Sequence, residues 1–223
     1  MLTYFNESNN YTLAYDQRPR PYHHAIAQLV LSGSSEAPTI LDVGCGVGNT
    51  LGEIRRLGGS FTATAADIDP ECLRRTGLHV PIDRSILLET SESIYSLAGT
   101  YDVVLLSHVL QYEPDPARLV KHLVSLLNDA GLFIVAIPNL VTPARFAAYT
   151  RGRARTEGLY YWDRRSFVRF LTDVCGASVQ QTSGDYVPLP GESRAPALTR
   201  LGVRLASCFP LLTFSTICVV GND

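Results

Sequence analysis

The stretch that decides the fold is Thr39-Ile40-Leu41-Asp42-Val43-Gly44-Cys45-Gly46-Val47-Gly48. Its first five residues form a short apolar run of the kind that fills a buried strand. The three glycines let the backbone turn tightly and approach a ligand with no Cβ in the way. A helix is predicted next, from Asn49 to Leu57, and its first turn offers free N–H groups. This order of strand, glycine loop and helix suits a nucleotide-like ligand.

An acidic residue follows the second predicted strand. The segment from Phe61 to Ala66 is predicted as a strand that ends at Asp67, and Pro70 is well placed to open a helix through Arg75. A carboxylate at Asp67 can accept hydrogen bonds from both hydroxyls of a ribose. The alternative is that the glycines form a structural turn and Asp67 caps the helix after it.

The spacing of the glycines separates two nucleotide-type ligands. The nicotinamide fingerprint GxGxxG would need its third glycine at position 49, which is Asn49. This loop is GxGxG instead, and Asp42 precedes it. A carboxylate at Asp42 suits a pyrophosphate poorly but is tolerable near the cationic part of a sulfonium cofactor. The sequence therefore disfavours a nicotinamide-dependent oxidoreductase.

Strands and helices alternate through the rest of the chain. Buried strands are predicted at 101–106 and 132–137, with a helix at 116–127 between them. The third strand is either 79–82 or 85–88, and the sequence leaves both open. Further on, the predicted elements are a helix at 163–174 and strands at 179–187 and 214–220. The alternation predicts a doubly wound α/β sheet with its ligand site at the carboxyl ends of the strands.

One domain is predicted over residues 1–223. Its parts are an N-terminal helical cap (1–35), a cofactor-binding core (36–140) and a substrate-side insertion with the C-terminal strands (141–223). A last strand that closely follows another strand is predicted to be antiparallel and to lie at an edge of the sheet. We expect the apolar segment 211–214 to form an edge strand, with a dimer contact as the alternative.

Composition and charge restrict the partners. With 46% hydrophobic residues, 18% charged residues and a net charge of -2, the chain is typical of a globular protein without a phosphate-tracking surface. Its five cysteines show no CxxC pair, so neither zinc nor a disulfide scaffold is expected. Neither a signal peptide nor an apolar run of about 18 residues is recognisable. We expect a cytoplasmic monomer or homodimer with no metal, nucleic-acid or membrane partner.

Four motifs resemble those of one enzyme superfamily. They are Ile40–Gly48, Ala66–Glu71, Tyr101–Pro116 and Pro138-Asn139. Together they cover most of residues 38–140, and they resemble the motifs of class I S-adenosylmethionine-dependent methyltransferases, in the branch that acts on small molecules. The resemblance implies a Rossmann-like sheet of seven strands with an antiparallel last strand.

The resemblance also implies a cofactor site. The glycine loop would lie beside the methionine part of S-adenosylmethionine, Asp67 on the ribose and Ile68 beside the adenine. The full expected set is Asp42, Gly44, Cys45, Gly46, Gly48, Asn49, Asp67, Ile68, Thr90, Ser91, Ser107 and His108.

Two departures from the family pattern matter. Gln111-Tyr112 stands where related sequences often carry Glu-His, so a role of that histidine as base does not carry over. The Gly-Asp pair usually found near the adenine has no clear counterpart. Thr90, Ser91 or Asp83 are the candidates to replace it.

Methyl transfer from a sulfonium is an in-line displacement, so the protein mainly holds the acceptor close, in line and dry. A hydroxyl acceptor benefits from a base near the methyl group. His108, at the end of the fourth strand, is the best-placed candidate, with His24 and Tyr112 as further ones. His108 could equally be a hydrogen-bonded structural residue under the cofactor.

The acceptor pocket is expected between the cap and the insertion. Aromatic side chains there would exclude water and face the sulfonium cation. The candidate residues are Tyr15, Tyr22, His23, Asn139, Tyr160, Tyr161 and Trp162. A solvated helix face for the histidine, and ordinary core packing for the aromatic residues, are the alternatives.

The loop after the fourth strand, Ser107-His108-Val109-Leu110, argues against several classes of methyl acceptor. Enzymes that methylate base or glutamine amino groups resemble a family with Asn/Asp-Pro-Pro-Tyr there, and cytosine-carbon methyltransferases one with Pro-Cys. By elimination we expect a small-molecule acceptor, most favourably a hydroxyl oxygen. The alternatives are N-methylation of a small metabolite and a non-catalytic cofactor-binding partner of a biosynthetic enzyme.

Overall fold

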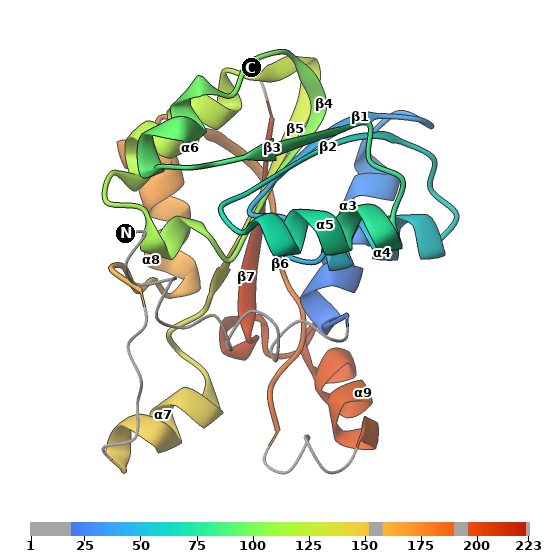
Figure 1. The fold of residues 1–223 in the computed structure, drawn as a ribbon. Coiled ribbons are helices and arrows are strands. Elements are labelled where there is room, and N and C mark those ends of the chain that lie inside the picture. The colour runs from blue at the N-terminus through green and yellow to red at the C-terminus, as the bar shows by residue number, and fades with distance from the viewer. Residues whose placement is uncertain (1–18, 152–157, 190–195, 222–223) are drawn as a thin grey trace.

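The computed structural model of the protein describes residues 19–151, 158–189 and 196–221. Seven strands form one mixed sheet in the order β3-β2-β1-β4-β5-β7-β6 (Figure 1). Their bounds are β1 Thr39–Val43, β2 Thr62–Asp67, β3 Arg84–Leu87, β4 Tyr101–Ser107, β5 Leu127–Pro138, β6 Ser178–Gly184 and β7 Ser215–Gly221. The first five strands pair in parallel, and β7 is antiparallel to β5 and β6. The predicted Rossmann-like sheet with an antiparallel last strand is confirmed.

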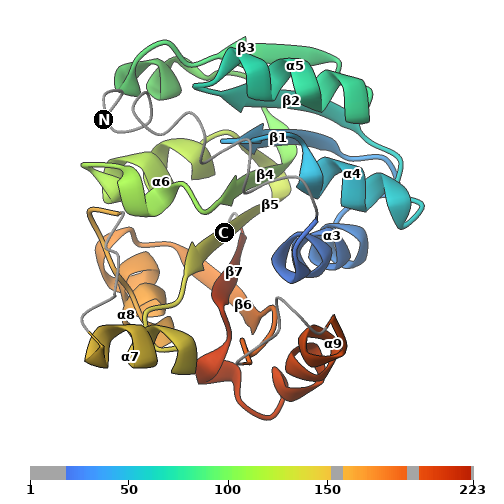
Figure 2. The same cartoon turned by 60° about the horizontal axis from the view of Figure 1, so that its bottom comes forward.

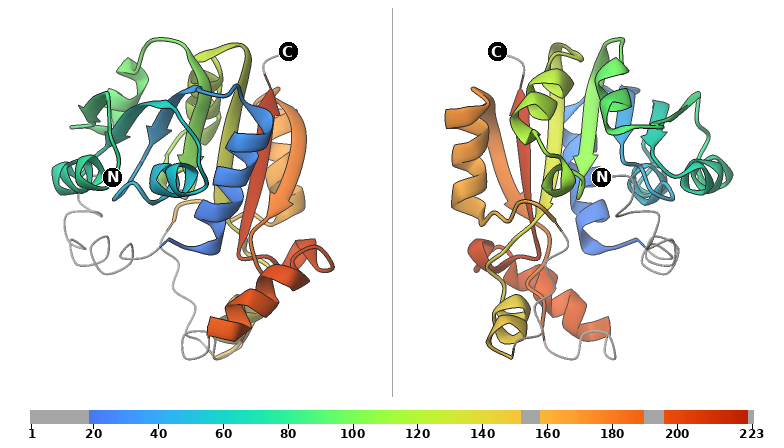
Figure 3. Two further views of the ribbon diagram at one scale, coloured as in Figure 1. Left: turned by 90° about the vertical axis from the view of Figure 1, so that its right-hand side faces the viewer. Right: turned by 60° about the vertical axis from the view of Figure 1, so that its left-hand side comes forward.

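Helices cover both faces of the sheet (Figure 2). One face carries α3 (Pro21–Gly33), α4 (Asn49–Arg56) and α5 (Pro70–His79). The other carries α6 (Pro116–Val124) and α8 (Arg164–Arg169), which continues as a π-helical turn at Phe170–Val174. The remaining two, α7 (Pro143–Thr150) and α9 (Pro196–Leu205), lie beyond the carboxyl edge of the parallel strands (Figures 1 and 3).

Successive residues of the strands pack in two separate hydrophobic cores, one on each face of the sheet. Ile40 of β1 packs in one cluster with Ile26 of α3 and Leu51 of α4. The next residue, Leu41, belongs to the opposite cluster with Leu119 of α6. Because successive strand side chains point to opposite faces and both faces are covered, these strands are continuously apolar.

The structure corrects several element boundaries and adds two helices that were not predicted, α7 and α9. The third strand, β3, is the second of the two predicted alternatives, moved by one residue. Helix α6 ends at Val124, before the predicted position 127, because Leu127 already pairs with Tyr101 at the start of β5. Helix α9, between β6 and β7, was not predicted.

The predicted edge position of the last strand is wrong. β7 lies between β5 and β6, and all of its seven residues are buried, as an interior strand requires. The edge strand is β6, which leaves Gln180 and Gln181 exposed to solvent. Most of segment 211–214 belongs to the short 3-10 turn Pro210–Leu212 and its exit, so it is not an edge strand. Within the described ranges, no helix has the length and apolarity needed to span a bilayer.

Candidate cofactor site and active site

The glycine loop after β1 has a left-handed backbone. Gly44, Gly46 and Gly48 have φ values of 71°, 55° and 80°. A Cβ on Gly44 would overlap the side chain of Val109, and one on Gly48 would lie 2.7 Å from Cγ2 of Thr76. The loop therefore needs glycine both for its conformation and for close packing against two other segments.

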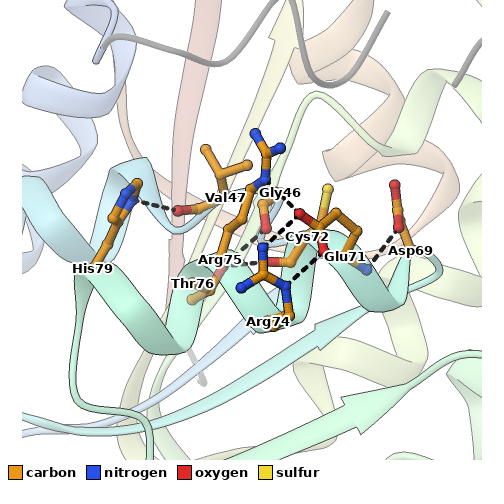
Figure 4. Close-up of polar contacts among 9 residues, drawn as sticks. All are labelled: Gly46, Val47, Asp69, Glu71, Cys72, Arg74, Arg75, Thr76 and His79. Atoms are coloured by element: carbon orange, nitrogen blue, oxygen red, sulfur yellow. Dashed lines mark hydrogen bonds and ion pairs between the residues drawn. The ribbon is translucent and has the colours of Figure 1, made fainter. Parts of the chain in front are cut away.

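Helix α5 holds the glycine loop from behind (Figure 4). The buried hydroxyl of Thr76 lies 2.9 Å from the Gly46 carbonyl oxygen and 3.0 Å from that of Cys72, so its single proton is shared between these two acceptors. Nδ1 of His79 lies 3.3 Å from the Val47 carbonyl oxygen. Asp69 caps the start of α5 by accepting the N–H of Glu71. The sequence analysis missed Thr76, because a threonine inside a helix carries no motif of its own.

Two buried carboxylates lie beside the loop. Oδ2 of Asp67 accepts the N–H of Gly46 at 2.8 Å, and its Oδ1 accepts the N–H of Asp69 at 2.9 Å. Burial raises the pKa of Asp67 to about 6, against the lowering effect of these two bonds. Burial and the nearby charge of Asp67 raise the pKa of Asp42 to about 7. Oδ2 of Asp42 has no hydrogen-bond partner among the described residues.

His108 follows β4 with an unusual backbone. Its φ of 57° is left-handed, and the Gln111 amide holds its carbonyl oxygen at 2.7 Å. Its ring stacks on Tyr22 of α3 with centroids 4.4 Å apart, and Nε2 lies 3.0 Å from the Ser215 hydroxyl. Burial, then repulsion from His23 when that ring is protonated and from the charges of Arg145 and Arg20, lowers the pKa of His108 to about 3. The ring is therefore neutral at physiological pH.

The other two histidines of α3 have different surroundings. His23 is buried with its ring 4.0 Å from that of Tyr22, and its Nδ1 accepts the N–H of Arg20 at 2.8 Å. Neutral His23 thus carries its proton on Nε2. His24 instead pairs with Glu53 of α4 at 2.7 Å. The side chain of His24 thus joins α3 to α4, and its predicted catalytic role stays a prediction.

Asn139 was expected to bind substrate, and the structure corrects this. It is fully buried, and its amide nitrogen donates to the carbonyl oxygens of Leu211 and Thr213, both at 2.9 Å. Its Oδ1 accepts the N–H of Val141. Asn139 therefore joins the end of β5 to the segment before β7.

The three aromatic residues Tyr160, Tyr161 and Trp162 are divided between core and surface. Trp162 is buried and packs against Phe167 and Phe170, so the core alternative holds for it. Tyr160 stacks on the outer side of Trp162, and its hydroxyl donates to the Pro114 carbonyl oxygen.

This segment closes onto the turn after β4. The N–H groups of Leu159 and Tyr160 donate to the carbonyl oxygen of Gln111, and the Tyr161 hydroxyl accepts the N–H of Gly158. Tyr112 is half-buried in the same turn. Tyr15 lies outside the described residues.

The remaining predicted cofactor residues lie at the same sheet edge, with one correction. Cys45 and Asn49 belong to the glycine loop and the start of α4, and Ser107 ends β4 with a buried hydroxyl that has no partner among the described residues. Ile68 follows β2 and is half-buried against one core. The residues after β3 are Thr90, which caps the 3-10 turn Ser91–Ser96, and Ser91 itself. Asp83 precedes β3 and accepts the N–H of Ala63, so it lies at the opposite edge and cannot replace the missing acid.

Fold and site together define a class of protein. A glycine loop after β1 and an acidic residue after β2, at the carboxyl edge of a doubly wound sheet, form a Rossmann-like site for a nucleoside cofactor. A family model described as a methyltransferase domain matches residues 15–174, and the chain belongs to this family. It is a class I, Rossmann-like member, whose cofactor is S-adenosylmethionine.

Known proteins with similar sequences and folds agree with this class. The chain is 32% identical over 129 residues to the ubiquinone biosynthesis O-methyltransferase of Xanthomonas campestris pv. campestris (strain B100), covering 56% of this chain and 51% of that protein. The chain thus spans about half the length of the curated relatives it matches. A chain in the complex of the Haloferax volcanii activator Trm112 with a methyltransferase has a TM-score of 0.66 at 19% identity, covering 98% of this chain and 95% of that one. The plantazolicin methyltransferase BpumL, solved with S-adenosylhomocysteine, has a TM-score of 0.63 at 17% identity, covering 99% and 93%.

The residues present fit this cofactor. Each Asp67 oxygen accepts one N–H and keeps a further lone pair for a ribose hydroxyl. The unpartnered Oδ2 of Asp42 suits the cationic methionine part, because a neighbouring positive charge favours the ionised carboxylate. Asp67 would therefore hold the ribose, and Asp42 would face the methionine part.

Proposed function

We propose that this chain transfers the methyl group of S-adenosylmethionine to a hydroxyl oxygen of a small molecule. The observation that carries the proposal is the half-buried, neutral ring of His108 at the carboxyl end of β4, stacked on Tyr22. The next residue, Val109, packs against Gly44 of the cofactor loop, so the base candidate lies directly beside that loop. The name of the Xanthomonas relative, an O-methyltransferase, supports the choice of acceptor atom.

When bound, the cofactor supplies an electrophilic methyl group on a cationic sulfur. His108 accepts the proton of the acceptor hydroxyl, because its neutral ring has an unshared electron pair. Tyr22 packs against the ring and excludes water from this side. Arg20 and Arg145 place positive charge near His108, which favours an oxygen that becomes anionic as it loses its proton.

Methylation of nitrogen is the alternative, and matched acceptors separate the two reactions. An amine brings its own lone pair, so it needs no base before attack. We expect catechol to increase the release of S-adenosylhomocysteine, and its diamine analogue o-phenylenediamine not to do so. His108→Gln should lower the rate with catechol about 100-fold, the usual contribution of a general base. Faster turnover of the diamine, independent of His108, would contradict oxygen transfer.

A small-molecule acceptor is the proposed substrate, and a protein partner is a separate question. A structural neighbour occurs in a complex with an activator protein, so we include co-purified partners in the test. If the isolated chain binds S-adenosylhomocysteine but transfers no methyl group to either acceptor, the same panel should be repeated with proteins that co-purify with the full chain.

A further inference from the structure

A chain of two hydrogen bonds leads from the half-buried ring of His108 into the protein interior. Its Nε2 lies 3.0 Å from the hydroxyl of Ser215, the first residue of β7, and that hydroxyl lies 3.0 Å from Oδ2 of Asp185. Ser215 is fully buried and Asp185 is 5% exposed. Asp185 directly follows β6, so the pairing of β6 with β7 brings the two residues together. The geometry points to Ser215 and Asp185 as positioning residues that fix the tautomer of His108 and leave its Nδ1 free to take the acceptor's proton.

The carboxylate of Asp185 determines which groups donate and which accept in these hydrogen bonds. Oδ1 of Asp185 accepts the N–H of Tyr186 at 2.7 Å and that of Ser215 at 2.8 Å. An ionised carboxylate only accepts hydrogen bonds, so the single hydroxyl proton of Ser215 must go to Oδ2. The Ser215 oxygen is then an acceptor for His108, whose proton must lie on Nε2. The unshared pair of the ring is therefore on Nδ1.

The charge states of Asp185 and His108 support this placement of the proton on Nε2. Burial raises the pKa of Asp185 to about 6, so it is ionised at neutral pH, while the ring of His108 is neutral. The charged or titratable groups that act on His108 are His23 and Arg20 from the α3 side and Arg145 of α7, and all of them oppose a positive ring. The carboxylate of Asp185, reached through Ser215, offsets this opposition when the ring takes a proton.

The backbone of His108 also indicates a maintained orientation. A φ of 57° is costly for a residue with a Cβ and persists only where the surroundings hold it. The contacts that hold it include the Gln111 amide on its carbonyl oxygen, Tyr22 on its ring and Ser215 on Nε2, and its N–H donates to the Ala136 carbonyl oxygen. A structural role alone would need burial, but not a particular tautomer.

This proposal rests on the proposed function, the transfer of a methyl group to a hydroxyl oxygen. In that step every bond that breaks is matched by a bond that forms. The O–H bond of the acceptor breaks and its proton forms an N–H bond at Nδ1 of His108. The electron pair left on the oxygen forms the new O–CH3 bond, while the pair of the S–CH3 bond stays on sulfur. The ring gains the positive charge that the sulfonium loses.

The test reads the tautomer directly and the rate separately. Long-range 1H–15N spectra of the full chain with S-adenosylhomocysteine should show the proton of His108 on Nε2. In Asp185→Asn the side-chain amide donates to the Ser215 oxygen. The Ser215 hydroxyl then donates to Nε2 of His108, so the ring proton should move to Nδ1. With catechol as acceptor, kcat should then fall at least about 100-fold, with little change in the KM for the cofactor. Ser215→Ala should lower kcat similarly, and Ser215→Thr, which keeps the hydroxyl, should restore most of it.

Thr216→Val is the matched control. It removes a neighbouring buried hydroxyl that has no partner among the described residues, and should change neither the tautomer nor kcat. In the wild type kcat should also fall as the pH drops through about 6, where Asp185 takes up a proton, and Asp185→Asn should lack this limb. A wild-type proton on Nδ1, or an unchanged tautomer in Asp185→Asn, would overturn the relay. The expected tautomers with a normal rate in His108→Gln would instead overturn the base role in the proposed function.

Discussion

Replacing Asp42 by Asn should make the cofactor-free protein more stable at high pH. Burial raises the pKa of Asp42 from its ordinary 3.8 to about 7, so the folded state holds a proton that the unfolded chain has released. Stability is therefore highest at low pH and falls as the pH rises from about 4 to 7. The full effect corresponds to ~4 kcal/mol at pH 8, an upper value because water entry reduces it. A neutral amide at position 42 removes this loss.

Urea unfolding at pH 5 and pH 8 measures the effect. We expect the stability of Asp42→Asn relative to the wild type to increase by ~1–3 kcal/mol between the two pH values. Asp102→Asn in the neighbouring strand β4 is the control without a pH effect, because bonds from Thr39 and Asn128 lower the pKa of Asp102 and its carboxyl is ionised in both the folded and the unfolded state from pH 5 to pH 8. Equal stability differences for Asp42→Asn at both pH values would refute the assignment of a raised pKa. The same variant should bind S-adenosylmethionine more weakly, since it lacks the charge that faces the cation.

Three further predictions concern the cofactor loop. Asp67→Asn should weaken S-adenosylhomocysteine binding about 10- to 100-fold in calorimetric titration, the worth of one hydrogen bond to a charged group, while Asp83→Asn, at the other sheet edge, should leave it unchanged. Thr76→Val removes the bond to the loop and should weaken the same binding about fivefold with little change in melting temperature; undiminished affinity would show that α5 does not shape the loop. Gly44→Ala should cost ~1–3 kcal/mol in urea unfolding, and Val109→Ala in the same chain should recover part of it if the overlap with Val109 is the cause.

The cofactor half of the site was predictable because its residues are local in the sequence. The glycine loop lies between β1 and α4, and Asp67 ends the very next strand, so a short pattern contains both. The apolar run of β1 was likewise predicted at its observed bounds. Spacing sufficed to predict that the glycine loop and Asp67 lie together, as the bond between Gly46 and Asp67 shows.

The residues that support His108 could not be found in this way. Asp185 and Ser215 are separated by 30 positions and meet only because β6 pairs with β7. Asn139 looked like a substrate residue because it follows a buried strand, but its partners lie 72 and 74 positions away. These contacts depend on the pairing of segments far apart in the sequence. The periodicity of apolar residues does not predict which segments pair.

The missed helix α9 and the misplaced β7 have physical reasons as well. Gly202 lies inside α9 and lowers its helix propensity, yet a Cβ there would overlap the carbonyl oxygen of Val187. Close packing thus explains a residue that argued against a helix. All seven residues of β7 are buried, as an interior strand requires, but the order of the strands along the chain suggested an edge.

The atom that receives the methyl group tests the central claim most directly. The full chain should be incubated with S-adenosylmethionine carrying a 13C-labelled methyl group and with catechol, and the product examined by carbon NMR. We predict a labelled methoxy carbon whose yield falls in His108→Gln. A label on carbon, or on nitrogen when the diamine analogue is supplied at equal concentration, would contradict transfer to a hydroxyl oxygen.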